Sequence, residues 1–227
     1  MTFSLDQIIS DKVKPIGLKT IELPFLYREL TKGSTLCVGE GGEGGVEGVS
    51  ATVLHKNPEE NICCIDICDC PVGSYVDSKK QLPNFVFRNE DFVNIPSGES
   101  YNNVVCINVL EHFGFDSGIL TMGYDLNAVK KMGQIANKKI ILTVPYGYSP
   151  MIDDGSPISG RVYTPERIKT IVSMLRDYKF SVTSDLIIAD IFKRLDFKMV
   201  TDQYAYELYC RNRYQHEFLR LLAFTKL

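Results

Sequence analysis

The stretch that decides the fold is residues 34–50, which read STLCVGEGGEGGVEGVS. A short apolar run, residues 36–38, is followed by glycines at positions 39, 41, 42, 44, 45 and 48. Glycine has no side chain to pack and loses much backbone entropy on folding, so such a run disfavours both a strand and a helix. It permits a tight turn that approaches a ligand before a helix begins. A strand, a glycine turn and a helix open the nucleotide-binding half of a doubly wound α/β sheet; the alternative is a plain surface loop.

Composition places the 227-residue chain among ordinary globular proteins, with 44% hydrophobic and 23% charged residues. The formal net charge is −3 and the sequence pI is about 5.7, so nothing indicates a surface for nucleic acid. No apolar run approaches the ~20 residues of a membrane span. The opening residues, MTFSLDQIISDKVK, lack the apolar core of a signal peptide. We therefore expect a soluble, cytoplasmic protein with a single domain.

Seven cysteines occur in the chain, and their odd number and irregular spacing disfavour a disulfide framework. Four of them lie close together in sequence: Cys63, Cys64, Cys68 and Cys70. A structural zinc site usually takes two separated Cys-x-x-Cys pairs, or one such pair with histidines. Cys63 and Cys64 instead fall in an apolar run typical of a buried strand, where neighbouring side chains face opposite sides of the sheet. We expect them to be small core residues, and we expect no metal site.

Strands and helices alternate from residue 34 to residue 147. Apolar runs predict strands at residues 35–38, 61–66, 85–88, 103–108 and 139–144. Helical spacing predicts helices at residues 4–12, 17–31, 49–55 and 125–135. This alternation predicts a parallel sheet with helices on both faces, in which ligands bind beyond the carboxyl ends of the strands.

Asp66 ends the second predicted strand, 22 residues after Gly44. An acidic residue about 20 residues beyond the glycines accepts hydrogen bonds from ribose hydroxyls in dinucleotide-binding folds. An aspartate at the end of a strand is otherwise a helix cap or a turn former. The distance from the glycine turn favours the ribose interpretation.

The regular alternation of predicted strands and helices ends at residue 147. Thr164 and Pro165 predict the cap and first residue of a helix. Residues 181–189 and 204–210 are predicted as late strands. The tail, residues 214–227, has an apolar stripe that predicts a C-terminal helix packed on its own domain. A contact between copies of the chain through this helix, giving a homo-oligomer, is the alternative.

Five motifs in order resemble those of the class I S-adenosylmethionine-dependent methyltransferases. They are LCVGEGG at 36–42, CIDIC at 64–68, EDF at 90–92, CINVLEHFG at 106–114 and IILTVPYG at 140–147. The resemblance implies a doubly wound, mostly parallel α/β sheet of seven strands with helices on both faces, the last strand being antiparallel. It implies one domain over residues 1–227: a helical lead-in over 1–33, a cofactor-binding half over 34–147 and a substrate side over 148–227.

The resemblance also implies a site for S-adenosylmethionine. The glycine turn would contact the methionine part, Asp66 the ribose, and Asp91 with the Phe92 backbone the adenine amino group. The implied cofactor-binding residues are Gly39, Glu40, Gly41, Gly42, Asp66, Asp91, Phe92, Asn108 and Val109. The reaction would be an SN2 transfer of the sulfonium methyl group, in which alignment of the reactants supplies most of the catalysis.

His112 and Glu111 are the candidate catalytic residues. An imidazole can take a proton from a hydroxyl or amine nucleophile, although a histidine in a strand–helix turn is often a hydrogen-bonded structural residue. Tyr146, Arg161 and Tyr163 are candidates for the acceptor pocket, with Arg161 suited to a carboxylate or phosphate on the substrate. The expected acceptor is a small molecule or a glycan precursor rather than nucleic acid.

Two other functions stay open from the sequence. Gly39-x-Gly41-x-x-Gly44 with Asp66 also satisfies the NAD fingerprint, although the NVLEHFG segment and the lack of an obvious second catalytic domain disfavour an oxidoreductase. A non-catalytic binding module is the other alternative. It is motivated by Cys37, where the family usually has an acidic residue, and by Glu43, where it usually has its last glycine.

Overall fold

The computed structural model describes residues 19–39, 49–67, 84–116, 119–148, 160–191, 197–211 and 216–227. The strands in these ranges are β1 (Thr35–Val38), β2 (Ile62–Asp66), β3 (Phe85–Asn89), β4 (Tyr101–Ile107), β5 (Phe115–Asp116), β6 (Ile119–Leu120), β7 (Ala136–Pro145), β8 (Phe180–Ile191), β9 (Phe197–Val200) and β10 (His216–Lys226). The helices are α1 (Lys19–Glu29), α2 (Val49–Lys56), α4 (Tyr124–Ile135), α5 (Pro165–Asp177) and α6 (Asp202–Arg211), with 3-10 turns η2 (Phe92–Asn94) and η3 (Leu110–His112).

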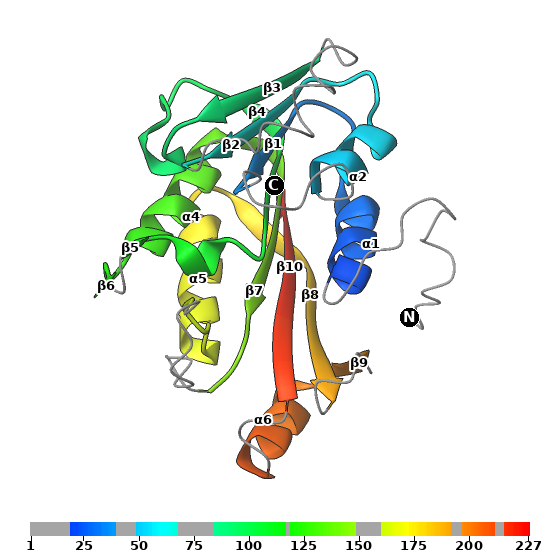
Figure 1. Cartoon of the computed structure of the whole chain (residues 1–227), viewed down its shortest axis with the longest axis vertical. Helices are drawn as coiled ribbons and strands as arrows, with labels where there is room; N and C mark the ends of the chain where they lie inside the picture. Colours follow the sequence, from blue (N-terminus) through cyan, green and yellow to red (C-terminus); the bar gives the residue numbers. More distant parts are fainter. Residues whose placement is uncertain are drawn as a thin grey trace. The chain divides into compact units, whose positions relative to one another are not determined.

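Eight of the described strands form one sheet in the order β3-β2-β1-β4-β7-β10-β8-β9 (Figure 1). The pairs β1–β2 and β2–β3 are parallel, whereas β10–β8 and β8–β9 are antiparallel. The predicted mixed α/β sheet is therefore confirmed. The sheet has eight strands rather than seven because β9 pairs with β8 at its edge. A separate hairpin pairs β5 with β6.

The chain divides into two compact units. Unit 1 comprises Met1–Val105 and Ile135–Ile141, and unit 2 comprises Cys106–Gln134 and Leu142–Leu227. The chain passes from unit 1 to unit 2 within β4, returns to unit 1 at the last residue of α4, and passes to unit 2 again within β7.

Unit 1 is built on the buried strands β1 and β2, against which α2 packs. Both strands are apolar almost throughout, as expected for central parallel strands. A polar cluster joins β4 to the residues before β1. Asn103, which is fully buried, accepts from the Thr31 backbone N–H at 3.1 Å and donates to the Thr31 carbonyl at 2.8 Å and to Thr35 Oγ1 at 3.1 Å. Because buried polar groups are costly unless hydrogen-bonded, these contacts fix β4 to β1.

Unit 2 contains two amphipathic helices. In α4 the fully buried residues Ala128, Val129, Met132 and Ile135 recur at helical spacing. The helix α5 begins as predicted: Thr164 Oγ1 accepts from the Arg167 N–H at 3.3 Å, and Pro165 is the first residue. It packs against β8. None of the described helices is long and apolar enough to cross a bilayer.

All five strands predicted before residue 147 are present, as are the helices predicted at 17–31, 49–55 and 125–135. The helix predicted at 4–12 lies outside the described residues. In the second half, the strand predicted at 181–189 is confirmed as part of β8.

The prediction of a C-terminal helix is wrong, because residues 216–226 form β10. Phe218–Phe224 are buried without a break and are apolar except for Arg220, and such a run fits a helix and a doubly covered strand equally well. The contact between copies of the chain was predicted through this helix, so its structural basis changes, and a homo-oligomer stays a prediction. The strand predicted at 204–210 is also wrong, since these residues belong to α6, whose first turn is capped by Thr201 Oγ1 accepting from the Tyr204 N–H at 3.2 Å.

Candidate functional site

The predicted glycine turn begins where β1 ends, in unit 1. Gly39 has a φ of +79°, in the left-handed region that favours glycine, and its N–H donates to the Ile65 carbonyl at 2.8 Å. Asp66 is the last residue of the neighbouring strand β2. The carboxyl ends of β1 and β2 thus present a glycine backbone and an aspartate side by side. Glu40, Gly41 and Gly42 lie outside the described residues.

Asp91 caps the turn η2 that follows β3, also in unit 1. Its Oδ1 accepts from the Val93 N–H at 3.0 Å, and its Oδ2 accepts from Asn94 Nδ2 at 3.1 Å. Phe92 is buried. The carboxylate is therefore held in one orientation by its own turn.

Asn108 and Val109 turn the chain after β4, in unit 2. Asn108 has a φ of +53°, which asparagine tolerates better than most residues, and its N–H donates to the Thr143 carbonyl at 3.0 Å. Val109 then precedes η3 with φ −136° and ψ −31°. The chain therefore makes a left-handed turn at the carboxyl end of β4, at the position where the sequence predicts cofactor contacts.

Glu111 and His112 form the turn η3. Glu111 is buried, whereas the His112 side chain is 50% exposed, and its Nε2 lies 3.8 Å from Glu111 Oε1. Partial burial lowers the pKa of His112 below its ordinary value. The imidazole is accordingly neutral at neutral pH, which is the form that can accept a proton.

Gly160 lies against this turn. A Cβ placed on Gly160 would stand 2.8 Å from Glu111 Cγ and 3.4 Å from His112 Cε1, so glycine is required for the approach. The next residue, Arg161, donates its N–H to the Glu111 carbonyl at 3.0 Å. These contacts hold both candidate catalytic residues from the side of the 160–163 segment.

A buried cluster around Asp125, which the sequence did not indicate, anchors that segment. Asp125 is fully buried in the first turn of α4. Arg167 donates to both of its oxygens, and Arg161 Nη1 lies 3.4 Å from its Oδ1. The Tyr163 hydroxyl lies 3.1 Å from Asp125 Oδ2 and 3.0 Å from the Leu110 carbonyl, and it can donate to one of them at a time. Burial, followed by the charge of Asp125, raises the pKa of Tyr163.

Arg161 is only 5% exposed. Besides Asp125, its guanidinium donates to the carbonyls of Phe113, at 3.3 Å, and Thr121, at 3.5 Å. These partners give Arg161 a positioning role in unit 2, in addition to the acceptor contact predicted from the sequence.

Tyr146 follows β7 and belongs to a second polar network. Its N–H donates to the Phe218 carbonyl at 2.9 Å, its hydroxyl donates to Asp202, and the Arg220 guanidinium lies 4.8 Å from its ring centre. Burial and the hydrogen bond to Asp202 raise the pKa of Tyr146. Arg220 also makes a bidentate pair with Asp185, at 2.5 and 2.7 Å. This network could not be predicted from the sequence, because it depends on the pairing of β10 with β8.

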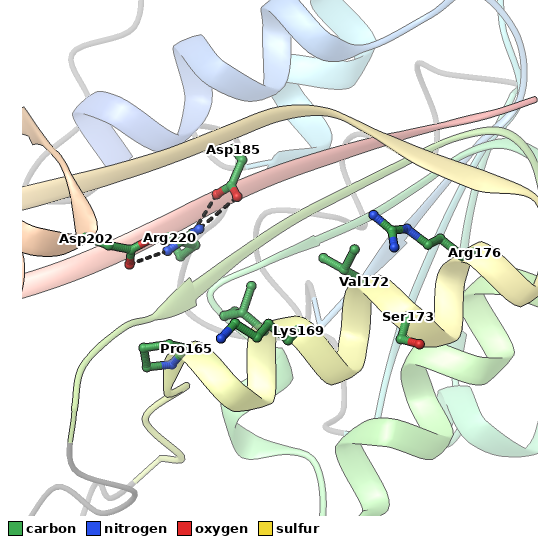
Figure 2. Close-up of a pocket in the computed structure, with 9 residues that line it drawn as sticks. Pro165, Lys169, Val172, Ser173, Arg176, Asp185, Asp202 and Arg220 are labelled. Carbon is green, nitrogen blue, oxygen red and sulfur yellow. Dashed lines mark hydrogen bonds and ion pairs between the residues drawn. The ribbon is translucent and has the colours of Figure 1, made fainter.

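A cavity of about 250 Å³ opens beside this network in unit 2 (Figure 2). Its lining residues are Pro165, Ile168, Lys169, Val172, Ser173, Arg176, Asp185, Asp202 and Arg220. Figure 2 shows the Asp185–Arg220–Asp202 network on one side and α5 on the other. None of these residues was a predicted site residue.

Cys63 and Cys64 are buried in β2, as expected, and burial raises the pKa of the Cys63 thiol. Cys68 and Cys70 lie outside the described residues. Among the residues that are described, no three His, Cys, Asp or Glu side chains gather in a way that could hold a metal ion.

No protein-family model and no curated protein matches the chain. Solved structures do match. The 1,6-didemethyltoxoflavin-N1-methyltransferase of Burkholderia thailandensis, with 1,6-didemethyltoxoflavin and S-adenosylhomocysteine bound, aligns with a TM-score of 0.59 at 11% identity, over 90% of this chain and 76% of that one. The (4+2)-cyclase SpnF aligns with a TM-score of 0.58 at 14% identity, over 90% and 80%.

The N-methyltransferase NodS of Bradyrhizobium japonicum, in complex with S-adenosylhomocysteine, aligns with a TM-score of 0.53 at 13% identity, over 98% of this chain and 96% of that one. These identities are low, so the likenesses bear on the fold and not on the reaction. The chain therefore has the fold of the class I S-adenosylmethionine-dependent methyltransferases.

Proposed function

We propose that this protein is an S-adenosylmethionine-dependent methyltransferase that acts on a small molecule. The observation that carries the proposal is the position of the sequence motifs in the fold. Gly39 follows β1 with a positive φ, Asp66 ends β2, and Asn108 follows β4 with a positive φ. In open α/β sheets ligands bind beyond the carboxyl ends of the strands. Two of the structural neighbours described above are methyltransferases solved with S-adenosylhomocysteine.

The residues at these strand ends fit the cofactor. The backbone of Gly39, Glu40, Gly41 and Gly42 would lie against its methionine part, and Asp66 would accept from the ribose hydroxyls. The remaining proposed contacts are Asp91, Phe92, Asn108 and Val109. The positive φ at Gly39 and Asn108 supports this, because the chain turns at both positions as soon as its strand ends.

When bound, the cofactor supplies an electrophilic methyl group for SN2 transfer. Neutral His112 would accept the proton of an acceptor hydroxyl or amine, since its lowered pKa keeps Nε2 or Nδ1 available. The neighbouring Glu111 carboxylate would stabilise the resulting imidazolium. Tyr146, Arg161 and Tyr163 are proposed to shape the acceptor side, the last two by fixing the 160–163 segment against η3.

A second function is favoured by two particular observations. Cys37, which stands where the resemblance expects an acidic residue, is fully buried in β1 and offers no carboxylate. The fold is also shared with SpnF, which is a (4+2)-cyclase. The second candidate is therefore a protein that keeps the fold for binding, or for a reaction other than methyl transfer.

The test is a thermal melt with S-adenosylmethionine, S-adenosylhomocysteine and NAD in parallel. A ligand at 100 times its Kd adds about 2.7 kcal/mol, which corresponds to a rise of roughly 5–10 °C in Tm for a chain of this size. We expect a rise with both sulfur compounds and none with NAD.

The matched variants are Asp66→Ala and Asp177→Ala. Asp177 is an exposed carboxylate at the last residue of α5, so its removal should leave the rise intact, whereas Asp66→Ala should remove it. No rise with either sulfur compound in the wild-type protein would overturn the proposal in favour of the second candidate. A rise with NAD alone would support the oxidoreductase alternative.

A further inference from the structure

The cavity in unit 2 has two cations on its α5 side. Lys169 and Arg176 are seven residues apart, or about two turns of helix, and therefore lie on one face of α5. Both line the cavity, and in Figure 2 the Arg176 guanidinium extends from the helix toward the strands. Neither side chain makes an ion pair or a hydrogen bond within the part of the chain that the structure describes.

The opposite side of the cavity neutralises these two cations only in part. Asp185 receives two hydrogen bonds from Arg220, and Asp202 Oδ1 receives one from Arg220 Nη1 at 3.0 Å and another from Tyr146. Burial alone would lower the pKa of Arg220, but the two aspartates outweigh it and raise that pKa. The two aspartates share the single cation Arg220, so this side keeps a formal charge of −1 against +2 on the α5 side, and the lining has a formal net charge of +1.

The cavity also has an apolar part. Pro165, Ile168 and Val172 contribute to its lining, all from α5. Its volume of about 250 Å³ falls just below the usual range for small-molecule pockets, roughly 300–1,000 Å³. A compact molecule with one apolar body and one anionic group matches this combination of size, apolar wall and free cations.

We infer that this cavity is a binding site for a small organic anion, a carboxylate or a phosphate ester, held by Lys169 and Arg176 against Ile168 and Val172. The inference stands apart from the proposed methyl transfer, because none of the lining residues belongs to the predicted cofactor site. It assigns a ligand class to a cavity whose lining residues were not predicted as site residues from the sequence.

The experiment follows the methyl NMR signals of Ile168 and Val172 during titration of the full chain at physiological ionic strength. Three probes share one apolar body: benzoate, phenyl phosphate and benzyl alcohol. We expect saturable shifts of these two residues with one or both anions and none with the alcohol. The anion that binds more tightly identifies the source of the negative charge. Equal shifts with benzyl alcohol, or no shifts with any probe at millimolar concentrations, would overturn the inference.

Variants then test the two cations. Lys169→Met and Arg176→Met should each weaken anion binding about tenfold or more, since a hydrogen bond to a charged group is among the stronger contacts. Lys130→Met removes an exposed cation of α4 that does not line the cavity, and it should bind the anion like wild type. Unchanged affinity in the Lys169→Met/Arg176→Met double variant would contradict the assignment. Because binding of S-adenosylmethionine is measured separately, failure here leaves the proposed function untouched.

Discussion

The Tyr163 hydroxyl lies 3.1 Å from the Asp125 carboxylate, and both side chains are fully excluded from solvent. Asp125 stands at the start of α4, and Tyr163 stands two residues before α5. Their contact therefore ties together the beginnings of two helices that are distant in sequence. Arg161 and Arg167 balance the buried charge.

Removing that charge is expected to be costly. Asp125→Asn leaves two arginines facing a neutral amide, and loss of one partner from a buried ion pair costs about 3–5 kcal/mol. For a chain of this size the Tm should fall by roughly 10 °C. Asp177→Asn, at an exposed position, is the matched control and should change the Tm little. A fall in Tm no larger than that of the control would show that the Asp125 cluster does not stabilise the 160–163 segment.

Gly160→Ala should disturb the candidate catalytic turn. The new methyl group would meet Glu111 Cγ at 2.8 Å, so Glu111 and His112 must move. Gly98→Ala is the control, because nothing lies within 4 Å of its Cβ position and its φ is not positive. We expect Gly98→Ala to be neutral or slightly stabilising, by up to about 1 kcal/mol, and Gly160→Ala to lower both stability and turnover. Equal behaviour of the two variants in melts would contradict the packing of Gly160 on η3.

His112 should make the protein less stable in mild acid. Its folded pKa lies below the unfolded value of 6.5, so between these values the unfolded chain binds more protons than the folded one. The free energy of unfolding therefore rises with pH through this window, and the cost of burying the imidazole is fully present below the folded pKa. His112→Gln should lose less stability than wild type between about pH 7.5 and about pH 5.

The same property can be measured directly. An NMR titration of the His112 ring should give a pKa below 6.5. A value at or above 6.5 would contradict the lowered pKa, and with it the availability of the neutral imidazole as a base at neutral pH.

Asn103 should be important for the stability of unit 1. Asn103→Ala removes the partner of the Thr31 N–H, whereas the Thr31 carbonyl keeps a hydrogen bond from Asn57 Nδ2 at 3.0 Å. A group left without its partner costs about 1–3 kcal/mol, so we expect a loss in this range in denaturant unfolding. The neighbouring Asn102→Ala is the control, because its side chain makes one long, exposed hydrogen bond, to the Lys32 carbonyl at 3.4 Å. Similar losses in the two variants would show that the buried hydrogen bonds of Asn103 do not contribute to the free energy of unfolding.

The first half of the fold could be predicted because local signals agreed with one another there. The glycines after residue 38 and the aspartate at 66 mark strand ends, and the helix between them has its own apolar spacing. The strand at 139–144 was predicted from its own apolar run. Each of these signals is contained within a few neighbouring residues.

The second half could not be predicted in the same way, because its order depends on pairing between distant segments. Residues 218–224 are buried throughout, so they carry no period that separates a strand from a helix. Because these residues were predicted as a helix, the Arg220–Asp185 ion pair could not be predicted. The two side chains meet only when β10 pairs with β8. The Asp125 cluster was equally hidden, because its members come from α4, α5 and the segment before α5.

The position of β10 also has a consequence for how the molecule is made. Of the strands in the sheet, β10 is synthesised last, yet it lies between β7 and β8 (Figure 1). During synthesis, one edge of β8 therefore stays unpaired until residues 216–226 leave the ribosome. An exposed strand edge can pair with strands of other chains, which leads to aggregation. Closing the sheet joins segments more than 70 residues apart, from β7 to β10, so slow folding with a high contact order is expected. We therefore expect the chain to be most prone to aggregation in the interval just before β10 pairs with β7 and β8.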